Sequence, residues 1–164
     1  MRGVLLIMQI RKAVMIDKEE IKDIVVQTIK AIYPRYYPKG AVEFFLTHHS
    51  EENIIRDIEA NKVFVLENKG KLVGTVTIKE NEICRLFILP THQRNGFGTA
   101  LLIFAEDLIS KSHGKIQIDV SLPAKKLYLK QGYKEIESHT ILTDNGDYLF
   151  YDVMERLAVR QYEQ

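Results

Sequence analysis

Residues 82–110 read EICRLFILPTHQRNGFGTALLIFAEDLIS, an apolar segment followed by a glycine-containing turn and an amphipathic segment. Residues 83–89 are apolar apart from one arginine, which is typical of a strand buried on both faces. Pro90 ends this strand because proline cannot donate to a sheet ladder. From Thr99 onward, apolar residues recur at helical spacing. The sequence therefore predicts a buried strand that turns directly into a helix.

The turn between these two elements has the features of an anion-binding site. A helix start leaves about four backbone N–H groups without partners and carries the positive end of the helix dipole. Gly96 and Gly98 lack the side chains that would keep a phosphate away, and Arg94 adds a positive charge. An ordinary tight turn remains an alternative for a G-x-G pair alone. The dinucleotide fingerprint does not fit, because Leu101 stands where the third glycine is required.

Two longer motifs resemble the GNAT superfamily of N-acetyltransferases. The first resembles its acyl-CoA-binding motif and consists of Gln93-x-x-Gly96-x-Gly98 with flanking Leu86-Phe87-Ile88-x-Pro90 and Thr99-Ala100-Leu101-Leu102. The second resembles its A-x-x-F-Y-x-x-x-G-F segment and reads Ala124-x-x-Leu127-Tyr128-x-x-x-Gly132-Tyr133. The two motifs occur in the expected order. The resemblance covers about residues 8–156 and is concentrated between residues 82 and 133.

This resemblance implies an α/β fold (an α+β mixed sheet) of the GNAT-like acyl-CoA N-acyltransferase type. Its central mixed sheet would have about six to seven strands flanked by about four helices. We expect a single domain over residues 1–164, with an extension at residues 1–7 and a frayed tail at residues 160–164. Periodicity predicts a parallel strand at 115–121 after the motif helix and a carboxyl-terminal hairpin. Asp17 followed by Glu20 predicts a capping box on the first helix.

Composition and charge exclude some classes of partner. Apolar residues make up 46% and charged residues 27% of the chain, and the net charge is +1. A strongly basic face would be expected for nucleic-acid or membrane binding, so neither is predicted. The histidines lack metal-ligand spacing, so no metal is expected. Cys84 lies in an apolar strand and is expected to act as a small hydrophobic residue. We expect a cytoplasmic protein, and the family resemblance is compatible with a homodimer.

Acetyl transfer to an amine requires a base for the ammonium, stabilisation of the carbonyl oxygen and an acid for the leaving thiolate. Tyr128 shares a helical face with Ala124 and Leu127, so its phenol is expected to point inward. The resemblance places the matching tyrosine beside the CoA sulfur and makes Tyr128 the candidate general acid. A plain core tyrosine is the alternative. Glu82 is the candidate base, through a water molecule, and a solvated turn residue is the alternative.

The resemblance implies acetyl-CoA as cosubstrate and a slot for its pantetheine arm between the strands at 83–89 and 115–121. Phe87 and Ile88 would line this slot through main-chain groups, with an oxyanion-stabilising N–H near Ile88. Ser121 stands where many relatives carry asparagine, and its shorter reach leaves the contact with the cofactor arm open. The remaining expected cofactor-binding residues are Arg94, Asn95, Gly96, Phe97, Gly98, Thr99 and Ala124.

The resemblance also places the first two helices and their connection beside the acceptor pocket. Candidate acceptor contacts there are Tyr33, Tyr36, Tyr37, His48 and His49. The alternative is that the tyrosines pack the loop and the histidines lie on a solvated face. The leading hypothesis is an N-acetyltransferase that acts on a small-molecule or peptide amine. A non-catalytic acyl-CoA-binding or regulatory module on the same fold is the alternative, and the sequence does not identify the acceptor.

Overall fold

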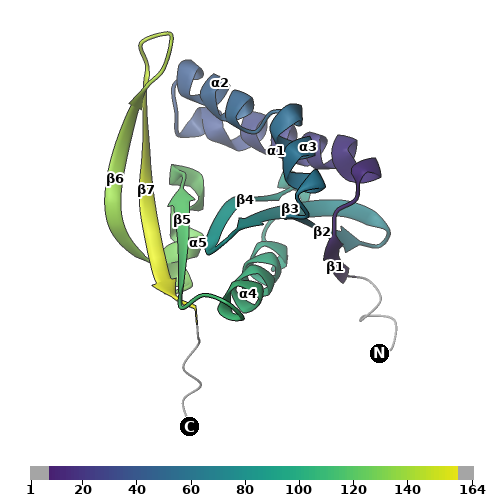
Figure 1. Ribbon diagram of the computed structural model, residues 1–164. Helices are drawn as coiled ribbons and strands as arrows, with labels where there is room; N and C mark the ends of the chain where they lie inside the picture. The colour runs from purple at the N-terminus through teal and green to yellow at the C-terminus, as the bar shows by residue number, and fades with distance from the viewer. Residues whose placement is uncertain (1–7, 159–164) are drawn as a thin grey trace.

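The strands of the protein form one mixed sheet, seen in a computed structural model that describes residues 8–158 (Figure 1). The strands are β1 (Met8–Lys12), β2 (Val63–Asn68), β3 (Lys71–Lys79), β4 (Glu82–Ile88), β5 (Lys115–Val120), β6 (Lys134–Leu142) and β7 (Tyr148–Leu157). The α-helices are α1 (Lys18–Ile32), α2 (Lys39–His48), α3 (Glu51–Glu59), α4 (Phe97–Ser110) and α5 (Lys125–Lys130). Short 3-10 helices are η1 (Met15–Asp17), η2 (Tyr33–Arg35), η3 (Pro90–His92) and η4 (Leu122–Ala124). The extension expected at residues 1–7 and the tail expected at residues 160–164 lie outside the described residues.

The strand order is β1-β2-β3-β4-β5-β7-β6, and every neighbouring pair is antiparallel except β4 and β5. The parallel pairing follows from the chain path, since α4 carries the chain from the end of β4 back to the start of β5. This arrangement confirms the predicted mixed sheet, and its seven strands agree with the expected number.

The parallel pair opens soon after it begins. Only Glu82 with Gln117 and Ile83 with Ile118 are in register between β4 and β5. By contrast, β5 pairs with β7 from Lys115 through Val120. The sheet is therefore split at its centre, and the split widens toward the carboxyl ends of β4 and β5.

Helices cover both faces of the part of the sheet formed by β1 to β4. In Figure 1, α1 and α3 lie above this part and α4 lies below it, while α2 lies toward β7. Gly74 of β3 lies where α4 packs most closely, because a Cβ there would be 2.5 Å from Ile88 Cδ1 and 3.0 Å from Leu101 Cδ1. The side chains of Ile21, Ile29, Leu101 and Leu102 are fully buried between helices and sheet. Packing on both faces accounts for the nearly continuous apolar sequence of β4.

The carboxyl-terminal hairpin is joined to the helical layer by polar contacts. The Tyr37 hydroxyl donates to the Phe150 carbonyl at 3.1 Å and accepts from the Leu122 amide at 2.7 Å. The Gly40 amide, in the first turn of α2, donates to Asp147 Oδ2 at 2.8 Å. These bonds join the segment that leads into α2 to the carboxyl-terminal hairpin and to η4. They therefore fix one wall of the space above the split.

Asp17 begins α1 without the capping geometry that the sequence predicts. Asp17 already lies in the αR region and its side chain makes no cap bond to α1. Its carboxylate instead accepts from the Val14 amide at 2.8 Å and from Arg11 Nη1 at 2.8 Å. A 3-10 turn therefore precedes α1, and the ion pair with Arg11 replaces the predicted capping box. Within residues 8–158, no helix is both long and apolar enough to cross a membrane.

Candidate active site

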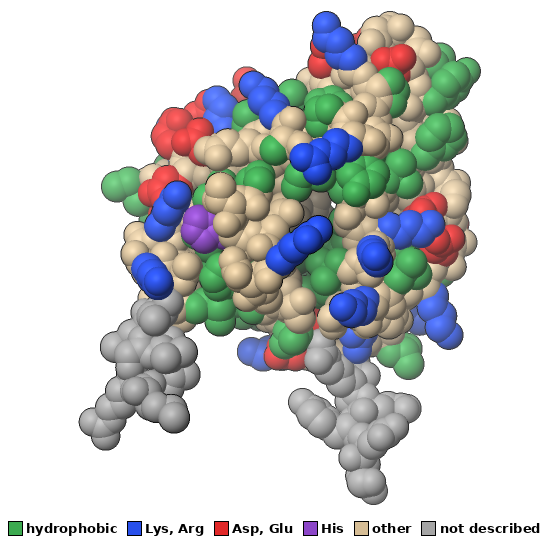
Figure 2. Space-filling model, turned by 180° about the vertical axis from the view of Figure 1, so that it is seen from behind, with side chains coloured by type: hydrophobic (Ala, Val, Ile, Leu, Met, Phe, Trp, Pro, Cys, Tyr) green, Lys and Arg blue, Asp and Glu red, His purple; other side chains and the backbone are tan. Residues whose placement is uncertain are grey.

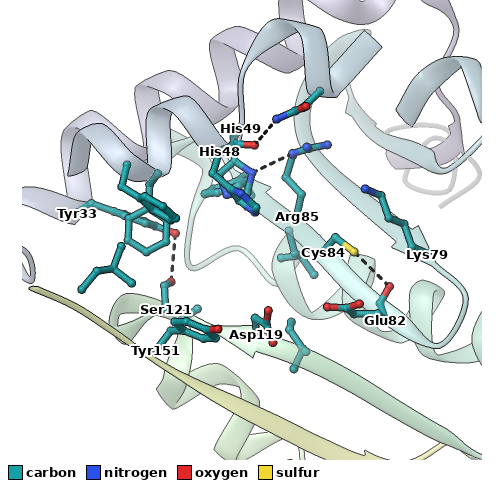
Figure 3. Close-up of a pocket in the computed structure, with 18 of the residues that line it drawn as sticks. Tyr33, His48, His49, Lys79, Glu82, Cys84, Arg85, Asp119, Ser121 and Tyr151 are labelled. Atoms are coloured by element: carbon teal, nitrogen blue, oxygen red, sulfur yellow. Dashed lines mark hydrogen bonds between the residues drawn. The ribbon is translucent and has the colours of Figure 1, made fainter. Parts of the chain in front are cut away.

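A cavity of about 470 Å³ lies over the split, between β4 and β5 below and α2 and α3 above (Figure 3). Both predicted catalytic residues, Tyr128 and Glu82, line it. The aromatic part of its wall is formed by Tyr33, Phe44, Phe45, Phe87 and Tyr151. The charged part is formed by Arg56, Asp57, Lys79, Glu82, Arg85 and Asp119. The cavity thus joins an apolar end with a charged end.

Tyr128 lies at the apolar end and is 3% exposed. Burial, reinforced by the neighbouring Tyr33 and Glu106, raises the pKa of its phenol well above the usual value. Its ring packs edge-to-face against Tyr133, with 5.4 Å between ring centroids. Within residues 8–158, no group forms a hydrogen bond with the Tyr128 hydroxyl. A buried hydroxyl without a partner is costly, so this atom is suited to a ligand that supplies one.

Main-chain groups of β4 face the split in alternation. The Leu89 amide donates to the Val73 carbonyl at 2.8 Å, so it points toward β3. Phe87 is opposite Thr75 and pairs with β3 in the same way. The amides of Leu86 and Ile88 therefore point to the side from which β5 has separated. Phe87 lines the cavity, and the expected contact of its main-chain groups with the cofactor arm stays a prediction.

Ile88 lies beyond the cavity, whereas Leu86 lines it. The Ile88 carbonyl accepts from Thr28 Oγ1 at 3.2 Å and from Gln93 Nε2 at 3.0 Å. These bonds fix the end of β4. Within residues 8–158, Gln93 is the one residue of the glycine-containing turn whose side chain hydrogen-bonds to this strand end. Of the two amides that face the split, that of Leu86 belongs to a residue that lines the cavity, and the oxyanion-stabilising N–H expected near Ile88 stays a prediction.

The predicted phosphate turn has the backbone expected of an anion site. Gly96 caps α4 in the left-handed region at φ 82°, and no side chain caps this helix start. Arg94 also has a positive φ of 64°. A Cβ on Gly98 would meet only Ile88 Cγ1 at 3.7 Å and Leu127 Cδ2 at 3.9 Å. Since these are ordinary contacts, packing within the protein does not require glycine at position 98, which leaves room for a ligand as the reason.

The other residues expected at the phosphate turn lie around the same helix start. Arg94 and Asn95 are exposed, and Phe97 and Thr99 are half-buried in the first turn of α4. Asn95 Nδ2 donates to the His92 carbonyl at 3.3 Å, which closes the turn. The face seen from behind carries lysine and arginine side chains around its centre (Figure 2).

Ser121 and Ala124 follow β5 and line the cavity. Ser121 Oγ lies 3.1 Å from the hydroxyl of Tyr33, which belongs to η2 (Figure 3). Burial raises the pKa of Tyr33 to about 12, so its hydroxyl stays protonated and can act as the donor in this pair. The contact of Ser121 with a cofactor arm was left open by the sequence. In the structure, the Ser121 hydroxyl has a protein partner, Tyr33, which is one of the predicted acceptor residues.

The structure separates the remaining acceptor candidates. Tyr33, His48 and His49 line the cavity. Tyr36 is 51% exposed, and neither it nor Tyr37 belongs to the cavity wall. The Tyr37 hydroxyl is instead used in joining the helical layer to β7 and η4.

Glu82 and Asp119 lie at the charged end, on the two strands that separate (Figure 3). Burial raises the pKa of Glu82, the negative charge of Asp119 raises it further, and Lys79 opposes them. Burial also raises the pKa of Asp119, against the effect of His139 and His48. The pKa of each carboxyl is thus shifted toward neutral pH, which suits a group that exchanges protons with an amine.

A buried polar cluster centred on Arg85, in the charged part of the cavity wall, was not predicted. Arg85 is 5% exposed and donates to Asp57 Oδ2 at 3.1 Å, to Thr77 Oγ1 at 3.0 Å and to His49 Nδ1 at 3.2 Å. Lys79 contacts the other oxygen of Asp57 at 3.1 Å. The only sequence signal was an arginine inside an otherwise apolar strand, because its partners come from α3, β3 and the end of α2.

Cys84 lines the cavity but is not suited to act as a nucleophile. Burial and the neighbouring Glu82 raise the pKa of its thiol to about 11, so it is almost entirely protonated at neutral pH. The thiolate, and not the thiol, is the reactive form. Cys84 is therefore mostly in the unreactive thiol form.

Comparisons with known proteins agree with this arrangement. The family model described as acetyltransferase (GNAT) domain matches residues 32–146, more than half of the chain. The chain therefore belongs to the GNAT family of acetyltransferases. A curated relative, the UPF0157 protein YqkA of Bacillus subtilis (strain 168), is 31% identical over 93 residues. That match covers 51% of this chain and 27% of YqkA.

Solved structures share the fold. A GCN5-related N-acetyltransferase from Rhodopseudomonas palustris superposes with a TM-score of 0.82 at 20% identity, covering 91% of this chain and 94% of that one. The PaiA N-acetyltransferase of Thermoplasma acidophilum, in complex with coenzyme A, gives 0.71 at 22% identity over 92% and 98% of the two chains. YncA, a putative acetyltransferase of Salmonella typhimurium with its cofactor acetyl-CoA, gives 0.71 at 17% identity over 96% and 97%.

Proposed function

We propose that the protein transfers an acetyl group from acetyl-CoA directly to the primary amine of an acceptor. The observation that carries this proposal is the split between β4 and β5, where Tyr128 lines the cavity with a buried hydroxyl that has no hydrogen-bond partner among residues 8–158. Two structurally similar acetyltransferases contain coenzyme A or acetyl-CoA, which supports the choice of cosubstrate.

The residues at the split fit this cosubstrate. The open helix start at residues 94–99 would bind the pyrophosphate through backbone N–H groups, with Arg94 at its rim. The amides of the pantetheine arm would form hydrogen bonds with the main-chain groups of β4 that face the split. Ala124 and Ser121 would lie along it, and Ser121 has Tyr33 as a second partner for its hydroxyl.

Three groups would serve the three steps of the transfer. The Leu86 amide would donate to the carbonyl oxygen as it gains negative charge. Tyr128, kept protonated by its raised pKa, would donate to the departing sulfur. Full proton transfer from so weak an acid is feasible because a thiolate in the same dry environment also has a raised pKa. Glu82, through a water molecule, would remove the proton from the amine.

The test is an assay of acetyl-CoA-dependent thiol release with a panel of amino-acid amides, short peptides, alkylamines and diamines. We expect at least one amine to be acetylated, with the product identified by mass spectrometry. If coenzyme A binds and none of the amines is acetylated at any pH, direct transfer to a small amine is wrong. Tyr148→Phe, an exposed tyrosine on β7, is the matched control for tyrosine substitutions.

A further inference from the structure

The neighbours of His49 determine which of its two ring nitrogens carries the proton. Arg85 Nε–H donates to His49 Nδ1 at 3.2 Å, and arginine has no atom that can accept. The guanidinium cannot turn away, because Asp57 and Thr77 hold its Nη1. His49 Nδ1 must therefore be the unprotonated acceptor, and the proton of the neutral ring is on Nε2.

His49 also stays neutral. It is 8% exposed, and burial together with the positive charge of Arg85 lowers its pKa to about 2. The adjacent His48 acts in the same direction. Across the working range of pH, His49 thus presents one unchanging hydrogen-bond donor, Nε2–H, and it does not act as an acid or a base.

This donor has no hydrogen-bond acceptor in the part of the chain that the structure describes. Within residues 8–158, no group accepts a hydrogen bond from His49 Nε2. His49 lines the cavity, at the wall shown in Figure 3, and its ring is 5.3 Å from that of Phe87. Phe87 is next to Leu86, so His49 is close to the part of β4 where the acetyl group would be transferred. An oxygen atom of a bound acceptor would satisfy the donor.

The opposite wall has the complementary chemistry. Glu82 and Asp119 approach from β4 and β5, and neither has an ion-pair or hydrogen-bond partner for its carboxylate among residues 8–158. They suit the ammonium group of the acceptor before it loses its proton. The cavity therefore offers carboxylates for an amine on one side and a neutral N–H donor for an oxygen on the other.

From this juxtaposition we propose that the acceptor is an α-amino carbonyl compound, either an amino acid or the amino terminus of a peptide. His49 is then the specificity-determining residue that donates to its carbonyl oxygen. An alkyl diamine or polyamine satisfies the carboxylates but offers His49 only ammonium groups, which cannot accept a hydrogen bond. The proposal rests on the proposed acetyl transfer, which it narrows to one class of acceptor.

The test compares two acceptors of similar shape. Alaninamide carries the carbonyl, and the branched alkylamine in which methyl groups replace its amide oxygen and nitrogen does not. The ratio of their kcat/KM values is measured in the wild type, in His49→Asn and in His49→Gln. Asparagine retains an acceptor for Arg85 near the position of Nδ1 but has no donor at the position of Nε2. Glutamine places an N–H near Nε2.

We expect the ratio to fall by about 10- to 100-fold in His49→Asn, through loss of activity with alaninamide alone, and to recover at least in part in His49→Gln. Because each variant is compared with itself, loss of folded protein does not change the ratio. Alanine and a dipeptide, tested in parallel, distinguish a free amino acid from a peptide terminus. Both belong to the proposed class.

An unchanged ratio in His49→Asn would overturn the proposal, as would a wild-type preference for alkyl diamines over every α-amino carbonyl compound. Either result would leave acetyl transfer intact, since an amine would still be acetylated. If no amine at all is acetylated, it is the proposed function that fails, and the two failures are therefore distinguishable.

Discussion

The buried hydroxyl of Tyr128 bears on both the stability of the protein and its proposed function. The residue is 3% exposed and its hydroxyl has no hydrogen-bond partner within residues 8–158, so burying it costs the free protein stability. The sequence motif predicted an inward-pointing tyrosine at this position. The sequence named His49 only as one of several acceptor candidates, and it did not predict Asp119 or Arg85, because these residues come from separate elements and only the folded chain brings them to one cavity.

For Tyr128→Phe we expect kcat to fall by about 100- to 10,000-fold if the hydroxyl is the acid. Thermal stability should stay the same or rise, because the substitution removes an unpaired buried hydroxyl and keeps the ring contact with Tyr133. Steady-state kinetics and thermal unfolding of the same preparation check both parts. Unchanged turnover would show that Tyr128 is only a core residue.

The pH dependence of the reaction should respond to the charges around Glu82. Asp119 raises its pKa and Lys79 lowers it. A base must be deprotonated, so kcat/KM should rise with pH through the pKa of Glu82. Asp119→Asn should move this acidic limb to lower pH, and Lys79→Met should move it to higher pH. If the acidic limb stays in place in both variants, Glu82 is not the base.

At the scale of elements, the chain from β4 into α4 performs two tasks with one sequence. The apolar strand supplies amides to the split, and the turn after it leaves the start of α4 without a side-chain cap. Sequence pattern was sufficient for this element, since glycine spacing and periodicity are local properties. It was insufficient for Asp17, whose carboxylate pairs with Arg11 of the preceding strand in place of capping α1.

Gly98→Ala should separate folding from cofactor binding. The added Cβ makes only ordinary contacts with the protein, and alanine favours a helix over glycine by roughly 0.5–1 kcal/mol, so stability should hold or increase. Affinity for coenzyme A, measured by titration calorimetry, should fall at least about tenfold because the methyl group occupies the phosphate side. Gly114→Ala, at an open position, is the control. Equal affinities of the two variants would contradict this role of the turn.

Tyr37→Phe tests an acceptor candidate that the structure assigns to the scaffold. The substitution removes the bonds to the Phe150 carbonyl and from the Leu122 amide, so the free energy of unfolding should decrease by about 1–3 kcal/mol. The KM for the acceptor should change little, because Tyr37 does not line the cavity. Denaturant unfolding and initial-rate kinetics provide the two values. A large rise in KM without loss of stability would return Tyr37 to the acceptor site.

At the scale of the whole molecule, the sheet consists of two parts that meet through two register pairs of β4 and β5. The class of fold and the parallel direction of this pair were predictable, because a helical crossover allows little else. The shape of the cavity was not predictable, since it depends on where the parallel ladder stops. A single domain over residues 1–164 and a possible homodimer stay predictions.

The most direct test of the central claim is a crystal structure of the protein with coenzyme A. We expect the pantetheine arm between β4 and β5, the pyrophosphate at the amides of residues 94–99, and the sulfur within hydrogen-bonding distance of the Tyr128 hydroxyl. Coenzyme A bound outside the split, or a sulfur atom remote from Tyr128, would contradict the account.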